Sequence, residues 1–121
     1  MQNKRFRTSL SLGLIALSAW NFSVRAEDGA YHFLKDIPVG GDGGWDYSSI
    51  DERAHRLYVS HGTKIVVIDL QTESVVGEIA DTPGVHGFAI APELQRGFSS
   101  NGRESKVSIG DLKTLKTRSQ G

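Results

Sequence analysis

The sequence predicts an all-β fold of about two units, each with four antiparallel strands, on three observations. Short apolar and β-branched runs follow one another after residue 30, with glycine, proline, aspartate or serine between them, as in strands joined by tight turns. The same region lacks the 3.6-residue apolar period of a helix. A strand pattern over residues 45–80 returns about 40 residues later, which predicts a first unit at 45–80 and a partial second unit at 85–121.

The first 26 residues predict a secretory signal peptide. Three basic side chains within residues 4–7 precede the apolar run Leu10–Trp20, and Val24 and Ala26 have the small-residue spacing of a cleavage site. The run has 11 residues, against about 20 for a membrane-spanning helix. An uncleaved anchor or a buried core helix is the alternative. We expect cleavage after Ala26 and a periplasmic or secreted product, residues 27–121, without a membrane span.

The composition of that product excludes some functions. Removing residues 1–26 takes away four basic side chains and no acid, which leaves 10 basic and 14 acidic residues and a net charge of 10 − 14 = −4. A mildly acidic chain lacks the basic surface that binds nucleic acid. The sequence has no cysteine, so packing alone must stabilise the fold.

Each expected strand ends at a turn signal. Tyr31–Val39 is followed by a glycine-rich run at 40–44, and we expect 31–37 to pair as the outer strand of a neighbouring unit or to lie loosely. The other expected strands are 45–50, 56–60, 64–69 and 74–79 in the first unit and 86–91, 96–100 and 106–111 in the second. A full outer strand is expected only at 74–79.

The repeat predicts the architecture. With an offset of 40, Tyr58 aligns with Phe98 and Gly62 with Gly102. Two additional residues then change the offset to 42, and Asp69 aligns with Asp111. A period near 40 with four strands per unit is typical of β-propeller blades. A β-sandwich with accidental internal similarity is the alternative.

Six recurring residues are expected to shape turns. Aspartate at the end of the third strand can accept hydrogen bonds from the backbone of the next turn, helped by threonine, and glycine supplies positive φ in the hairpin between the second and third strands. The six are Gly62, Asp69, Thr72, Gly102, Asp111 and Thr114.

A family resemblance rests on two stretches. "LYVSHGTKIVVIDLQTESVVGEI" and the following "GVHGFAIAPELQRGF" resemble the 40-residue YVTN-type β-propeller repeat, and the chain is most similar to secreted bacterial YncE-like proteins. The resemblance implies a periplasmic or surface-exposed propeller, mostly without an assigned activity in that family. Its repeat motif is structural, so it implies no catalytic residues and no cofactor.

The number of blades raises a further expectation. Propellers close with about four to eight blades, whereas this sequence holds about two. We expect a fragment or truncated gene product, with assembly of identical chains into a ring as the alternative.

Candidate ligand contacts lie in the loops that lead into the inner strands. Asp46 and His86 are equivalent in the repeat, and Trp45 is adjacent, so these three are the rim candidates for a protein, glycan or small ligand. The glycines at 40–44 lack the Gly-Lys-Ser/Thr of a phosphate loop. The four histidines show no metal-ligand spacing, so neither a metal site nor a catalytic residue is predicted.

Two classes of function remain open. The first is a binding or interaction scaffold without enzymatic activity. The alternative is the propeller domain of a periplasmic oxidoreductase, similar to a quinoprotein or haem dehydrogenase, or an electron-transfer partner. A covalent haem needs a Cys-x-x-Cys-His site, which a chain without cysteine does not have.

Overall fold

The computed structural model describes residue 29 and residues 31–120. The chain divides into two compact units, Met1–Phe33 and Leu34–Gly121. In the first unit, the few described residues form neither helix nor strand. The predicted signal peptide and its cleavage site lie outside the described residues, and both stay predictions.

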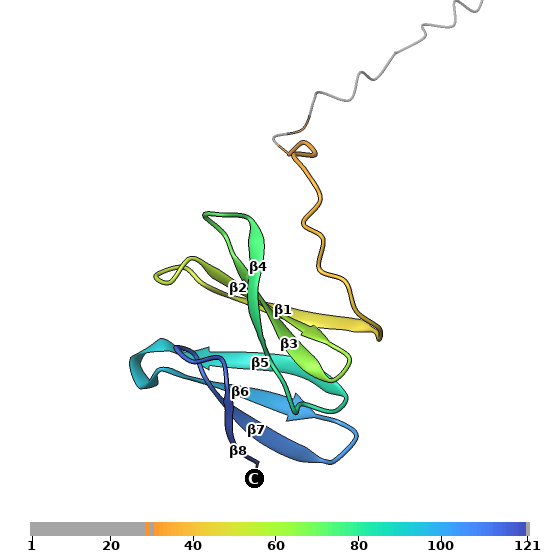
Figure 1. Cartoon of the computed structure of the whole chain (residues 1–121), viewed down its shortest axis with the longest axis vertical. Coiled ribbons are helices and arrows are strands. Elements are labelled where there is room, and N and C mark those ends of the chain that lie inside the picture. The colour runs from red at the N-terminus through yellow and green to blue at the C-terminus, as the bar shows by residue number, and fades with distance from the viewer. Residues whose placement is uncertain (1–28, 30, 121) are drawn as a thin grey trace, which may run out of the picture. The chain divides into compact units, whose positions relative to one another are not determined.

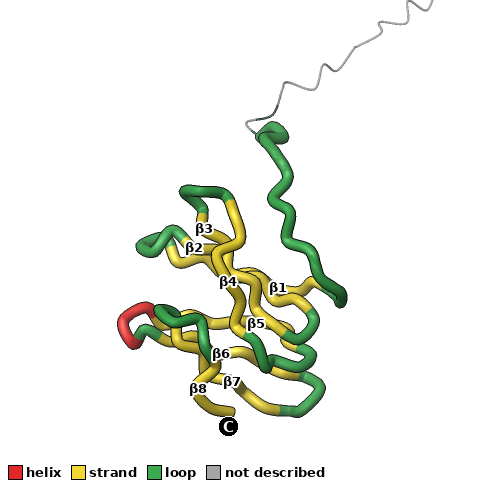
Figure 2. The backbone as a smooth tube through the Cα atoms, in the orientation of Figure 1, coloured by secondary structure: helices red, strands yellow, loops and turns green. Residues whose placement is uncertain are grey.

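The second unit is all-β, as expected (Figure 1). Its only described helix is the 3₁₀ turn η1 (Pro92–Leu94), drawn in red in Figure 2. The strands are β1 (Trp45–Asp51), β2 (Arg56–His61), β3 (Lys64–Asp69), β4 (Ser74–Ile79), β5 (Val85–Ala91), β6 (Arg96–Asn101), β7 (Lys106–Asp111) and β8 (Thr117–Gln120).

These strands form two four-stranded sheets in the orders β1-β2-β3-β4 and β5-β6-β7-β8. Every neighbouring pair is antiparallel, so each sheet is a simple meander. Figure 1 shows the two sheets as successive layers, with β5 beside the first sheet. The architecture is that of two β-propeller blades, which confirms the predicted fold class.

The two blades repeat each other down to their irregularities. The register between the first two strands shifts between Trp45 and Ser48 in one blade and between Val85 and Phe88 in the other. Left-handed backbone recurs after an offset of 40, at His55 (φ 52°) and Gln95 (φ 54°). Because bulges and positive φ values are specific local features, their recurrence supports the internal repeat more strongly than strand positions alone.

The core lies between the blades. The first blade contributes Tyr58, Ile65, Val67 and Ile79 and the second contributes Val85, Phe88 and Leu112, all at most 5% exposed. Burying an aliphatic or aromatic side chain of this size stabilises a fold by about 1.5–3 kcal/mol. The rings of Tyr58 and Phe88 meet across the interface with centroids 5.4 Å apart. The blades are therefore held together mainly by apolar packing.

Two glycines in the second blade leave room for large core side chains, Gly97 for Phe88 of the same blade and Gly110 for Ile79 of the first blade. A Cβ at Gly97 would lie 2.0 Å from Cζ of Phe88, and a Cβ at Gly110 would lie 3.1 Å from two carbons of Ile79. Their repeat equivalents in the first blade are Leu57 and Ile68. The small residues thus occur on the sheet face that receives the neighbouring blade.

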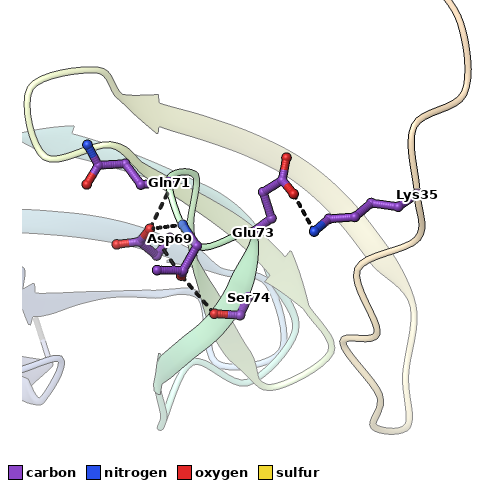
Figure 3. Close-up of polar contacts among 6 residues, drawn as sticks. Lys35, Asp69, Gln71, Glu73 and Ser74 are labelled. Carbon is purple, nitrogen blue, oxygen red and sulfur yellow. Dashed lines mark hydrogen bonds and ion pairs between the residues drawn. The ribbon is translucent and has the colours of Figure 1, made fainter.

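Residues 31–37 do not pair as an outer strand, so the structure shows the second of the two expectations, an unpaired segment. These residues form no ladder, and Lys35 instead forms an ion pair with Glu73 in the β3–β4 turn (Figure 3). A strand is stable only when a neighbouring edge pairs with its backbone, and no described strand pairs with this segment. The second blade does contain a fourth strand, although β8 has four residues where β4 has six.

Candidate functional site

A ladder of backbone hydrogen bonds marks the edge of the blades where the loops enter β1 and β5. The Gly62 N–H donates to the Gly44 carbonyl (2.9 Å), Gly84 to Gly62 (3.0 Å) and Gly102 to Gly84 (2.8 Å). The first and third bonds are equivalent within the repeat, and the middle bond joins one blade to the other. Four loops are thereby fixed side by side at this edge, which we call the rim.

The β-bulges place Asp46 and His86 on this rim. Each bulge inserts an additional residue into the first strand of its blade, at Asp46–Tyr47 and at His86–Gly87. Bulges change the direction of a side chain and are frequent beside binding sites. The His86 Nδ1 atom lies 2.8 Å from Oδ2 of Asp46, and the Asp46 Oδ1 atom accepts the Tyr47 N–H at 3.0 Å. The structure thus brings two of the three rim candidates into direct contact.

Both members of this pair are accessible to a ligand. The side chain of His86 is 63% exposed and that of Asp46 is 35% exposed. A carboxylate oxygen can accept more than one hydrogen bond, so the contact with His86 leaves further acceptor capacity on Asp46. The pair therefore offers both an acceptor and an imidazole to solvent.

Trp45 is positioned by a histidine that sequence reasoning did not select. The ring of Trp45 stacks on His61, with centroids 3.7 Å apart and planes 8° from parallel. His61 is 1% exposed, and its Nδ1 donates to the Gly44 carbonyl at 3.1 Å. Trp45 remains 54% exposed. The repeat contains one signal for His61, because it aligns this residue with another polar residue, Asn101, at the end of the second strand of the other blade. Both side chains are buried in the structure.

A shallow cleft of about 200 Å³ lies among these residues. Both blades contribute to it, and Arg103 adds a cationic side chain. Its lining consists of Gly44, Trp45, Asp46, Gly62, Gly84, Val85, His86 and Arg103. All three predicted rim residues therefore line one cleft.

The predicted turn residues Asp69 and Thr72 lie at the end of β3 opposite to its rim hairpin, in the turn that leads to β4. Figure 3 shows the contacts of Asp69 in this turn. The Asp69 Oδ1 atom accepts the N–H groups of Gln71 and Thr72, both at 2.8 Å, and the Thr72 hydroxyl at 3.2 Å. The hydrogen bond from the Thr72 N–H is the main reason that the pKa of Asp69 is lowered. These contacts hold a turn.

Asp111 repeats this arrangement in the second blade. Its Oδ1 accepts the N–H groups of Lys113 (2.9 Å) and Thr114 (2.8 Å), and its Oδ2 pairs with Arg118 at 2.8 Å. The Thr114 backbone bond is again the largest cause of a lowered pKa. Asp69 and Asp111 do not approach the rim cleft in the described structure, because neither lines it.

The expected role of Gly102 is wrong. Gly62 has a φ of 61° in a two-residue hairpin, but Gly102 is not among the residues with positive φ, and Ser105 (φ 51°) adopts the left-handed conformation instead. The two additional residues lengthen this hairpin to four residues and move the left-handed position to its end. Gly102 is small for another reason, since a Cβ there would lie 2.5 Å from Nε2 of His86.

Among the described residues there is no cluster of three or more histidine, cysteine or acidic side chains that could hold a metal ion. A search of the same residues for a helix long and apolar enough to cross a membrane finds none.

Comparison with known proteins supports the fold. No protein-family model matches the chain, and no curated protein matches it significantly. Among solved structures, a chain of "Kuenenia stuttgartiensis Hydrazine Synthase" is similar, with a TM-score of 0.60 and 19% sequence identity over 76% of this chain. The present chain spans only 25% of the length of that chain. A likeness at this identity shows the fold alone.

Proposed function

We propose that this chain is an exported β-propeller repeat protein of the YVTN type, related to YncE-like proteins, that acts as a binding scaffold through its rim cleft. The ligand class that fits the cleft best is a small polar molecule with one flat apolar face, such as a sugar ring. The observation that carries the proposal is the half-exposed Trp45 ring, held on buried His61 beside the Asp46–His86 pair.

The chemistry of the cleft matches such a ligand. A sugar ring has an apolar C–H face, which packs on an aromatic ring, and hydroxyl groups that both donate and accept hydrogen bonds. Trp45 supplies the aromatic surface, Asp46 supplies acceptors and Arg103 supplies donors. Because stacking already fixes the Trp45 ring, less side-chain freedom is lost on binding. The glycines of the cleft permit close approach to the backbone.

A binding experiment tests the rim assignment. Titration of the chain with a panel of monosaccharides, followed by calorimetry or NMR, should identify one that binds. We expect His86→Ala to weaken that binding by roughly 10- to 100-fold, because it removes an exposed hydrogen-bonding imidazole from the cleft and the contact that positions Asp46. The melting temperature should hardly change, since the His86 side chain is 63% exposed.

The matched control is Asp69→Ala at the opposite end of the blade. It should lower the melting temperature while the folded fraction keeps its affinity. The reverse result, with Asp69→Ala abolishing binding and His86→Ala without effect, would contradict the assignment. Trp45→Ala is less selective, because it also uncovers the buried His61 ring.

Export is the second part of the proposal and is supported by the basic cluster, the short apolar run and the small residues Val24 and Ala26. N-terminal sequencing of protein recovered from the periplasm or medium should begin at Glu27. Recovery of the intact Met1 terminus from a membrane fraction would contradict it.

The second candidate function is a propeller domain of an exported oxidoreductase or an electron-transfer partner. One observation favours it, namely that the matched solved structure is named as a hydrazine synthase. A bound chromophore distinguishes this candidate from the scaffold, because purified protein would then absorb visible light. A colourless preparation that binds a sugar supports the scaffold.

A further inference from the structure

A second cavity lies away from the rim, where the two blades meet. Its volume is about 240 Å³. The first blade contributes Asp51, Arg56 and Tyr58 to its lining, and the second contributes Gln95, Leu112 and Lys113. Asp51 and Arg56 lie at the ends of β1 and β2 that point away from the rim. This interblade cavity is therefore separate from the cleft around Trp45.

The Tyr58 hydroxyl is the unusual feature of this cavity. Tyr58 is 1% exposed, and its hydroxyl has no hydrogen-bond partner of acceptable geometry among the described residues. Buried hydroxyls in native proteins are nearly always paired, since an unpaired one is destabilising. The repeat places Phe98, which has no hydroxyl, at the equivalent position of the second blade. The blade fold therefore does not require a hydroxyl at this strand position.

Cationic side chains outnumber acidic ones in the cavity lining around Tyr58. Arg56 donates one Nη1 bond to the Leu112 carbonyl at 2.7 Å and has further N–H donors. Lys113 adds an ammonium group with three donors. Asp51 is the one acidic side chain of the lining, and its Oδ1 already accepts the N–H groups of Arg53 and Ala54, both at 3.1 Å. The lining has two cations and one anion.

A site of this charge fits an anionic ligand whose oxygens accept hydrogen bonds. Burial raises the pKa of Tyr58, and the nearby Arg56 opposes that rise without reversing it. The hydroxyl consequently keeps its proton at neutral pH and can donate it in a hydrogen bond. Arginine and lysine are the side chains that most often bind phosphate and carboxylate groups.

We propose that the interblade cavity binds a small oxyanion, a phosphate or a carboxylate, that accepts a hydrogen bond from Tyr58 and pairs with Arg56 and Lys113. Such a ligand would contact both blades and would hold them together. Because a ligand that binds only the folded state stabilises that state, the melting temperature should rise with ligand concentration.

Thermal unfolding of the full chain tests the proposal. The probe is inorganic phosphate, and sodium chloride at the same ionic strength is the reference. Sodium acetate in a parallel series distinguishes a carboxylate from a phosphate site. We expect one of the two oxyanions to raise the melting temperature by roughly 5–10 °C at concentrations well above its Kd.

Tyr58→Phe is the decisive variant. It should remove most of the oxyanion-dependent rise, and without oxyanion it should melt at the same temperature as the parent chain or slightly higher, because an unpaired buried hydroxyl has been removed. Tyr47→Phe is the matched control: Tyr47 is 74% exposed and does not line the cavity, so this variant should respond like the parent chain.

Lys113→Gln gives a second variant at an exposed position, and it too should lose most of the rise. Phosphate also stabilises many proteins because it is excluded from their surfaces. Such an effect would raise the melting temperatures of the parent chain and of Tyr58→Phe equally. An equal rise in both, or no rise in the parent chain with either oxyanion, would overturn the proposal.

Discussion

Asp69 and Asp111 show how one side chain can define a turn of this fold. Each carboxylate belongs to the last residue of a third strand, and each accepts the N–H groups two and three residues later. Sequence reasoning could predict this geometry because it is local: a short carboxylate reaches the next turn whatever the rest of the chain does.

The same contacts predict a pH dependence of stability. The pKa values of Asp69 and Asp111 are lowered in the folded chain. Their contribution is therefore fully present above the unfolded-state pKa of about 3.9, and it is lost as the pH falls through the lower folded-state values. The parent chain should have a higher free energy of unfolding than the double variant Asp69→Asn/Asp111→Asn at neutral pH. We expect this difference to disappear between about pH 5 and pH 2.

Asparagine is the suitable replacement, because its side-chain oxygen can still accept the two N–H groups but does not titrate in this range. Urea unfolding at a series of pH values measures the difference in free energy of unfolding between the two proteins. A difference that stays constant over the whole acidic range would show that these carboxylates are not the titrating groups.

The rim residues mark the limit of sequence reasoning at this scale. Asp46 and His86 could be selected because they are equivalent in the repeat, but their mutual contact depends on two bulges and on the packing of one blade against the other. His61 was missed because its stacking on Trp45 joins residues from different strands. Such contacts follow from tertiary structure and leave little local signal.

At the scale of elements, the strands within the repeat were predictable, whereas for the segment before it the sequence left a paired and an unpaired conformation open. β-Branched residues and turn signals place β3 and β7 at their observed bounds, Lys64–Asp69 and Lys106–Asp111. Residues 31–39 carry similar residue types but form no strand. A strand pattern specifies a conformation, whereas a ladder also requires a partner edge, which a single segment does not reveal.

The hairpins show a related limit. The alignment of the two repeats shows two additional residues before Lys106, but it does not show how they change the conformation of the hairpin. They shift the left-handed position from a glycine to Ser105, and the glycine then serves to accommodate the His86 ring. Loop length selects the turn type, so equivalent glycines in hairpins of unequal length need not have equivalent conformations.

For the molecule as a whole, stability depends on the contact between the blades. Phe88 lies at its centre: the ring is 5% exposed, meets Tyr58 across the interface and occupies the space above Gly97. Both sheets contribute to one apolar core, so we expect them to unfold together. Because the Phe88 ring packs directly on Gly97, the effects of substitutions at these two positions should depend on each other.

A double-mutant cycle on Phe88 and Gly97 tests this dependence. Gly97→Ala should destabilise the chain by roughly 1–3 kcal/mol, because the new Cβ would lie 2.0 Å from Cζ of a ring that is buried in the core. Phe88→Leu should cost about 1–2 kcal/mol, less than the 3–5 kcal/mol typical of replacing phenylalanine with alanine. Leucine lacks the distal ring carbons that cause the clash.

In the Phe88→Leu background, Gly97→Ala should therefore be nearly neutral or slightly stabilising, since alanine is favoured over glycine within a strand. Urea unfolding of the four proteins measures the coupling, and additive costs would show that the Phe88 ring does not set the space at Gly97.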